Sequence, residues 1–289
     1  MSVEESGSFR RGLDPFFIEQ LMNGAFRPLM NTVRDQRLDL EIRENYINIY
    51  RGRNSILKLE FRKREQAFCA SIHGKYNPPS GFIRSERDPY GRQVFTLAEA
   101  SAWTELFIAS VPQICHDSGI HNKPEGDAEF GIMGANQEPP FVALDRQLQL
   151  EGVRDSKVDL LGLSMSDGFA SMVLVELKHG KNLKPLAVLE QVDRYRRLYA
   201  PDFRLRRDVA DSLDETLALK RKLGLLLGAP PQPLRELPVD LLVVLVSADS
   251  PVLTPPATAA GGAIVHYVGL AAGDLRIPER NHWQVLRSS

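Results

Sequence analysis

The sequence is poor in cysteine and has no long apolar run. With only Cys69 and Cys115 among 289 residues, a framework of disulfides is excluded, and two free thiols suit a reducing compartment. No apolar run approaches the roughly 18 residues of a membrane span, and the N-terminal sequence MSVEESGSFRR contains no apolar signal core. We therefore expect a cytoplasmic protein without a membrane partner.

The sequence also lacks an excess of one charge and the common nucleotide-binding and serine-hydrolase motifs. The 36 Lys and Arg nearly balance the 37 Asp and Glu, so any basic surface for nucleic acid must be local. There is no P-loop, no G-x-S-x-G and no dinucleotide fingerprint. Cys115, His116 and His121 are too few soft ligands for a structural zinc site.

The first third of the chain predicts a helix followed by an antiparallel meander. Apolar residues recur with helical spacing over residues 14–30. Short runs with strand-like composition follow, separated by turn residues, at 38–42, 46–51, 55–61 and 66–72. A stretch rich in proline and glycine, residues 77–91, then marks a boundary. We expect an N-terminal helix and β-meander module over residues 1–92 and a second domain over 93–289.

The second part of the chain alternates helices and strands, which indicates an α/β domain. Thr96 and Glu99 form a capping-box pattern that opens a helix ending near residue 114, followed by a loop to residue 140. A strand over residues 141–152 precedes a hairpin over 157–178. Beyond it we expect helices over about 182–199 and 212–227, and strands over 239–247 and 262–270.

The hairpin carries the residues that point to chemistry. Asp167-Gly168 predicts a two-residue turn, because both central residues of a type I′ turn need positive φ. Asp159 then lies directly opposite Glu176, and apolar residues face one another at the neighbouring pairs, Leu161 with Leu174 and Leu163 with Met172. Glu176 and Lys178 share a face, because strand side chains alternate.

Two carboxylates opposite one another in a sheet destabilise it unless their charge is neutralised. A divalent cation does this, and Mg²⁺ is usually held by one or two carboxylates together with water and phosphate oxygens. The hairpin therefore predicts a Mg²⁺ or Mn²⁺ site beside the ammonium of Lys178.

The order of these elements resembles the PD-(D/E)xK nuclease superfamily, and within it the RecB-like branch, over residues about 96–250. The order is helix, strand, strand with Asp159, strand with Glu176-x-Lys178, helix with Gln191-x-x-x-Tyr195, and strand. The proline that names the motif is replaced by Val158, as in many members. The resemblance implies a restriction-endonuclease-like core, a mixed central sheet flanked by helices, and metal-dependent hydrolysis of DNA.

The same resemblance assigns a role to each motif residue. Asp159 and Glu176 would ligate Mg²⁺ or Mn²⁺, and Lys178 would orient or activate the attacking water and stabilise charge in the transition state. Gln191 and Tyr195 would line the site from the following helix.

Related nucleases often carry a further acid on the helix before the sheet, for which the chain offers Glu99 and Glu105. On a helical wheel Glu99 falls beside the apolar stripe and Glu105 nearly opposite, so Glu99 is the preferred third metal ligand. Its competing interpretation is the capping-box partner of Thr96.

Basic residues are dense after the hairpin and suit contacts with a phosphate backbone. Lys181, Arg194 and Arg197 are the preferred contacts with DNA, and double-strand cleavage would favour a homodimer.

Three alternatives remain open at this stage. The first is a structural role for the site residues: the E-x-K triplet also fits an ion-pair network, and Gln191 fits the margin of the helix stripe, where it would cap a loop. The whole domain also fits a catalytically inactive module of the same fold that binds nucleic acid or protein. The third is an unrelated enzyme site in the N-terminal module, where Arg51, Arg53 and His73 form no recognisable constellation.

Overall fold

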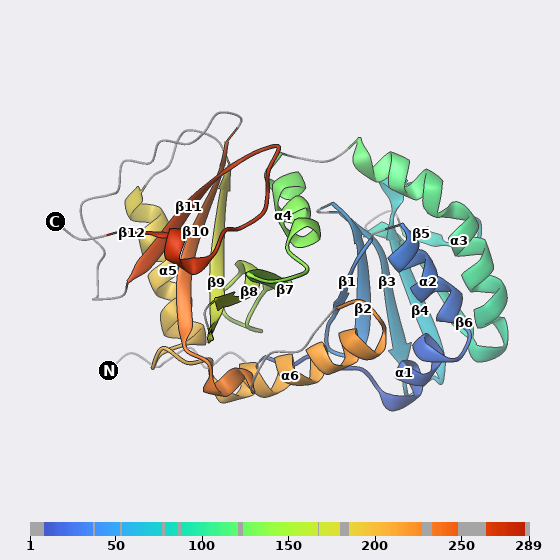
Figure 1. Ribbon diagram of the computed structural model, residues 1–289. Helices are drawn as coiled ribbons and strands as arrows, with labels where there is room; N and C mark the ends of the chain where they lie inside the picture. Colours follow the sequence, from blue (N-terminus) through green and yellow to red (C-terminus); the bar gives the residue numbers. More distant parts are fainter. Residues whose placement is uncertain are drawn as a thin grey trace. The chain divides into compact units, whose positions relative to one another are not determined.

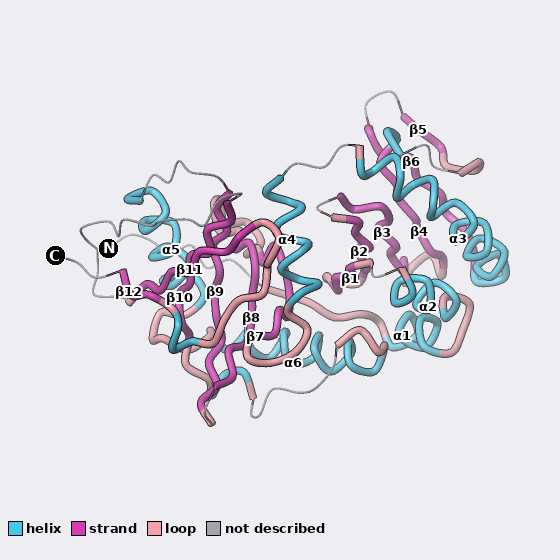
Figure 2. Tube along the Cα trace, turned by 45° about the horizontal axis from the view of Figure 1, so that its top comes forward, coloured by secondary structure: helices cyan, strands magenta, loops and turns pink. Residues whose placement is uncertain are grey.

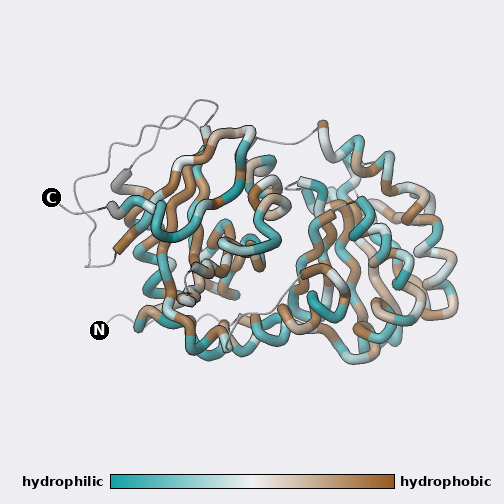
Figure 3. The backbone as a smooth tube through the Cα atoms, viewed as in Figure 1, coloured by the Kyte–Doolittle hydropathy of each residue, from teal (hydrophilic) through white to brown (hydrophobic). Residues whose placement is uncertain are grey.

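A computed structural model describes the chain except at the termini and at several loops (Figures 1 and 2). The described residues are 9–36, 38–52, 54–76, 79–85, 88–120, 124–166, 168–179, 185–226, 233–247 and 264–286. The fold is α/β and divides into two compact units. We call residues 11–130 with 218–226 the N-terminal unit, and residues 1–10, 131–217 and 227–289 the C-terminal unit. Figure 3 shows hydrophobic residues concentrated along the strands of both units.

The N-terminal unit is built on an antiparallel sheet of six described strands in the order β1-β2-β3-β4-β6-β5. The strands are β1 (Asp39–Ile42), β2 (Tyr46–Arg51), β3 (Asn54–Arg62), β4 (Ala67–His73), β5 (Ile83–Ser85) and β6 (Asp88–Thr96). The first four confirm the predicted meander. The predicted first helix is instead two helices, α1 (Pro15–Met22) and α2 (Arg27–Asp35), because α1 ends at the C-cap Asn23.

The helix that begins after Thr96 belongs to this same unit. It is α3 (Leu97–Gly119), and Trp103 lies between Phe95, with ring centroids 4.6 Å apart, and Phe107, at 5.4 Å. All three rings are buried in a core shared with the sheet and with α1 and α2. The boundary expected near residue 92 therefore falls inside β6, and the division between modules at 92/93 is corrected. The reason is that the apolar face of α3 packs on the sheet that precedes it.

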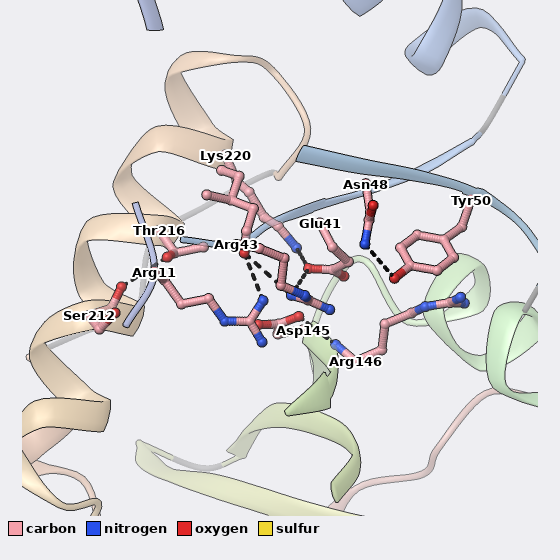
Figure 4. Close-up of polar contacts among 11 residues, drawn as sticks. Arg11, Glu41, Arg43, Asn48, Tyr50, Asp145, Arg146, Ser212, Thr216 and Lys220 are labelled. Atoms are coloured by element: carbon pink, nitrogen blue, oxygen red, sulfur yellow. Dashed lines mark hydrogen bonds and ion pairs between the residues drawn. The ribbon is translucent and has the colours of Figure 1, made fainter. Parts of the chain in front are cut away.

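The end of a distant helix completes the N-terminal unit. Helix α6 (Arg207–Lys222) contributes Leu219, and the turn after it contributes Leu223, to the core of this unit. The ammonium of Lys220 lies 2.9 Å from a carboxylate oxygen of Glu41 on β1, with side chains 5% and 0% exposed. Figure 4 shows Lys220 and Arg43 converging on Glu41. This buried charge pair and the leucines join segments 179 residues apart in the sequence.

The C-terminal unit is built on a mixed sheet of six described strands in the order β12-β11-β10-β9-β8-β7. The strands are β7 (Phe141–Leu148), β8 (Val158–Ser166), β9 (Phe169–His179), β10 (Val239–Ser247), β11 (Val265–Ala271) and β12 (Gln284–Leu286). Neighbours from β7 to β9 are antiparallel, β9 to β11 are parallel, and β12 is antiparallel to β11. The predicted mixed sheet is thus present.

Three helical features of the chain bear on the site and on the sequence predictions. Helix α5 (Pro185–Tyr199) packs against β9 and β10, whereas its predicted cap, Asn182, lies outside the described residues. Helix α4 (Pro124–Ala135) occupies part of the segment expected to be a loop. Within the described ranges, no helix combines the length and the apolar character needed to cross a membrane.

Candidate active site on the β8–β9 hairpin

The hairpin has the register that the sequence predicted. Leu161 pairs with Leu174 and Leu163 with Met172, and the pairing continues to Ser166 with Phe169 at the turn. Gly168 has φ of 79°, the left-handed conformation that a two-residue turn requires, whereas Asp167 lies outside the described residues. The turn and the apolar pairs together fix which residues of β8 and β9 are neighbours.

The two acids lie one residue beyond the last regular pair, Leu160 with Val175. There, a carboxylate oxygen of Asp159 accepts a hydrogen bond of 2.8 Å from the backbone N–H of Leu177. The side chain of Asp159 thus contacts the backbone of β9 between Glu176 and Lys178. Continued by one residue, the observed register would place Asp159 opposite Glu176, as the turn predicts.

Glu176 is 1% exposed and receives three polar side chains. Tyr195 donates to Oε2 at 2.7 Å and Gln191 donates to the same oxygen at 3.0 Å. Oε1 is paired with the ammonium of Lys178, which is 30% exposed and shares the face of Glu176. Burying a carboxylate is costly unless it is paired and hydrogen-bonded, and these donors supply that compensation.

Tyr195 connects the acid to the loop before β8. Its hydroxyl, which is completely buried, lies 2.5 Å from the backbone carbonyl oxygen of Lys157 and accepts a hydrogen bond of 2.5 Å from Gln191. Burial, followed by the negative charge of Glu176, strongly raises the pKa of Tyr195. The phenol therefore keeps its proton, which it shares between Glu176 and the carbonyl of Lys157.

Four of the five motif residues are thus joined directly, and the fifth contacts the same segment of β9. Gln191 and Tyr195 lie four residues apart on α5, so both reach Glu176 from one helix face. The alternative in which Gln191 only caps a loop is not supported, because its amide contacts Glu176 and Tyr195.

The third acid, Glu99, is held by the cap of its own helix. Glu99 belongs to the N-terminal unit, where it accepts hydrogen bonds of 2.7 and 2.8 Å from the backbone N–H and hydroxyl of Thr96. The capping box is complete, and these hydrogen bonds lower the pKa of Glu99. Glu105 is exposed on α3. The capping interpretation of Glu99 is confirmed, and its assignment as a metal ligand stays a prediction.

The predicted phosphate contacts have mixed outcomes. Lys181 lies outside the described residues. Arg194 is 45% exposed and 3.5 Å from Asp155, and Arg197 is 63% exposed and 3.4 Å from Asp193. Both guanidinium groups are therefore accessible on α5, each beside one acid.

Sequence reasoning missed the contact by which Tyr199 holds the loop before β8. Tyr199 donates a hydrogen bond of 2.8 Å to the backbone carbonyl of Ser156, and burial raises its pKa. The available signal was its spacing: Tyr199 follows Tyr195 by four residues and lies on the same helix stripe. The spacing places both rings on one face, but it does not show which groups their hydroxyls contact.

The donor set suits a hard divalent cation, although it is small. Asp159 and Glu176 offer carboxylate oxygens, the ligand type that Mg²⁺ and Mn²⁺ prefer. No group of three or more His, Cys, Asp or Glu residues suited to a metal occurs within the described part of the chain. A cation here would complete its coordination with water and substrate oxygens, as Mg²⁺ commonly does.

Comparison with known proteins adds no further assignment. No protein-family model matches the chain, and neither curated proteins nor solved structures show a significant match to it.

Proposed function

We propose that the chain is a metal-dependent nuclease that hydrolyses phosphodiester bonds of DNA, with its site on the β8–β9 hairpin. The observation that carries the proposal is the convergence of Glu176, Lys178, Gln191 and Tyr195 in one hydrogen-bonded group, next to Asp159. These residues come from two strands and a helix, and the resemblance to PD-(D/E)xK nucleases selected them before their contacts were known. A restriction-endonuclease-like core is part of the same proposal.

Each side chain has a role that follows from its position. Asp159 and Glu176 would hold Mg²⁺ or Mn²⁺, which supplies Lewis-acid activation and neutralises phosphate charge. Lys178 is partly exposed beside the buried acid, where its ammonium stabilises the negative charge that develops on the transferring phosphate. Gln191 and Tyr195 orient Glu176 and fix its rotamer through α5.

Activity tests the proposal directly. The full chain is incubated with supercoiled plasmid and with single-stranded DNA in Mg²⁺, in Mn²⁺ and in EDTA. We expect metal-dependent cleavage that Asp159→Asn, Glu176→Gln and Lys178→Met each lower by at least about a hundredfold, as expected for groups that act at the transition state. Asp211→Asn is the matched control, because Asp211 is 50% exposed on α6, where it pairs with Arg207 one helical turn away. Cleavage that survives Asp159→Asn or Lys178→Met refutes the assignment.

One observation favours a second candidate, a binding module in which the same residues form a structural network. Glu176 is 1% exposed and both its oxygens already have donors. A purely structural network predicts no stabilisation by Mn²⁺, whereas a cation site raises the free energy of unfolding by mass action. Urea unfolding of the wild type and of Asp159→Asn, with and without Mn²⁺, separates the two functions.

A further inference from the structure

The loop before β8 is held in one conformation by buried hydroxyl groups. We call residues 150–157 the anchored loop. Tyr195 and Tyr199 hold the backbone carbonyls of Lys157 and Ser156 at 2.5 and 2.8 Å. The hydroxyl of Ser156, itself fully buried, accepts from the N–H of Leu150 at 3.1 Å and lies 2.9 Å from the carbonyl oxygen of Val153. Four buried polar contacts thus fix a segment that is too short to form a core of its own.

The rigid loop presents cations to solvent. The side chain of Arg154 is 94% exposed, Lys157 is exposed, and Arg194 on α5 is 45% exposed next to the loop. Asp155 lies 3.9 Å from Arg154 and 3.5 Å from Arg194, and is itself 65% exposed. Glu151 is the other exposed acid of the loop. Exposed ion pairs contribute about 0–1 kcal/mol to folding, so stability does not account for this arrangement.

The loop is also connected to the acid pair. The hydroxyl of Tyr195 contacts both Lys157 of the loop and Glu176 of β9, and Asp159 follows Lys157 by two residues. A phosphodiester placed against Asp159 and Glu176 has neighbouring phosphates on the same strand, which long basic side chains beside the acids can reach. A fixed loop carries such contacts at a lower entropic cost than a mobile one.

We propose that the anchored loop binds the phosphate backbone of nucleic acid through Arg154, Lys157 and Arg194. Asp155 competes with phosphate for the two arginines. Its contacts with them orient their guanidinium groups and limit the affinity of the loop for nucleic acid. This inference rests on the proposed function, because it assigns the surface that delivers a phosphodiester to the acid pair. It adds Arg154 and Lys157 to the contacts that the sequence indicated, and it assigns Tyr199 as a positioning residue for the loop.

Binding is measured separately from cleavage. The full chain is titrated into a fluorescein-labelled oligonucleotide, single-stranded and as duplex, in EDTA over a series of KCl concentrations. Asp159→Asn in Mg²⁺ repeats the measurement with metal present and cleavage suppressed. Each lost phosphate contact makes the negative slope of log K against log salt shallower by about 0.7–0.9. Over a fourfold rise in salt, the variant therefore loses roughly threefold less affinity than the wild type does. We expect Arg154→Ala and Lys157→Ala each to have this effect.

Two further variants distinguish a lost phosphate contact from a loss of folding. Asp155→Asn removes the competing anion, and we expect binding about two- to fivefold tighter, a gain that misfolding cannot produce. Arg235→Ala is the matched control, because Arg235 is exposed in η2 (Leu234–Glu236), before β10. The first residue of β10 pairs with Met172, near the start of β9. Glu176 and Lys178 lie near the end of β9, so Arg235 is at the opposite edge of the sheet from the site. The control is expected to bind as the wild type does.

The outcomes distinguish this inference from the proposed function. Binding that depends on Arg154 and Lys157 without any cleavage retains the inference and refutes the nuclease. Cleavage with unchanged affinity and salt dependence in the loop variants retains the nuclease and overturns the inference. Equal weakening by Arg235→Ala, or Asp155→Asn that binds no tighter than the wild type, also overturns it.

Discussion

Tyr195→Phe is the substitution that tests the candidate site most closely. It removes one oxygen atom and leaves the completely buried ring in place. The lost hydroxyl contacts Glu176 at 2.7 Å and the carbonyl of Lys157 at 2.5 Å, and accepts from Gln191 at 2.5 Å. Because burial and the charge of Glu176 hold the pKa of Tyr195 far above its usual range, this phenol donates at every pH at which the protein is assayed.

The expected magnitude follows from the charge of the acceptor. A hydrogen bond to a charged group contributes about 1.5–3 kcal/mol, so the free energy of unfolding should fall by about 2–3 kcal/mol. Groups that orient a metal ligand typically contribute ten- to a hundredfold in metal affinity or activity, and we expect a loss in that range for Mn²⁺ binding and for cleavage. Tyr199→Phe is the matched control, because its hydroxyl donates to the neutral carbonyl of Ser156 at 2.8 Å. It should cost only about 0.5–1.5 kcal/mol.

Two measurements check these values. Urea unfolding gives the free energy of each variant, and calorimetric titration with Mn²⁺ gives its metal affinity. We expect both variants to be folded, and only Tyr195→Phe to bind Mn²⁺ more weakly. If the two tyrosine variants bind Mn²⁺ alike, Tyr195 does not orient a metal ligand, and the proposed role of the group around Glu176 is refuted.

Three further predictions concern stability and pH. Lys220→Met leaves the completely buried Glu41 without its ammonium partner and should lower the free energy of unfolding by about 3–5 kcal/mol. Adding Glu41→Gln should restore part of this loss in a double-mutant cycle measured by urea unfolding. If the effects of the two substitutions simply add, the two residues are not paired. Burial lowers the pKa of His266 below its ordinary value of 6.5, so the unfolded chain binds a proton more readily than the folded one. The free energy of unfolding should therefore fall as the pH drops from about 6.5 through the folded pKa. His266→Gln should flatten this dependence between pH 7 and 5. Gly162→Ala places a Cβ 2.0 Å from the ring of Phe141, which is 1% exposed, so thermal unfolding should show a loss of about 1–3 kcal/mol, and an unchanged midpoint would mean that the ring moves freely.

Local patterns predicted most of the strands because each carried its own signal. The meander was readable from alternation and turn residues, and the hairpin from Asp167-Gly168 together with apolar pairs on both faces. A register error of one residue would have moved every apolar side chain to the opposite face of the sheet, so the pattern admitted a single solution. The same constraint is the basis for predicting Asp159 next to Glu176.

Features set by distant contacts were not predictable in this way. The residues of β5 and β6 lie in a segment rich in Pro and Gly, and they form strands because β6 pairs along the whole of β4. The boundary between units was misplaced for a similar reason. The apolar face of α3 indicates that the helix packs on a sheet, but it does not indicate which sheet. The end of α6 joins the N-terminal unit through buried leucines and through the pair of Lys220 with Glu41, and these contacts leave no signature in the nearby sequence.

The candidate site shows both the strength and the limit of short motifs. Gln191 and Tyr195 were selected by their spacing on a helix, and the structure places both against Glu176. Glu99 was selected in a similar way, but the hydrogen bonds of the helix cap account for its carboxylate. The difference is physical: a polar residue in an apolar stripe needs a buried partner, whereas an acid in the first turn of a helix already has one in the backbone.

A carboxylate at position 176 runs against the packing of its own strand. Two of its neighbours on the same face, Leu174 along β9 and Val243 across β10, are apolar and buried, and its charged neighbours lie on the other side, toward the end of the strand. An apolar side chain at this position would need no partners, and replacing a buried charge network by apolar residues is often neutral or stabilising. Local departures from the folding pattern are expected where a protein carries out chemistry. An apolar side chain at this position would not need the two donors that α5 supplies, which fits the proposal that the charge of Glu176 serves to hold a cation.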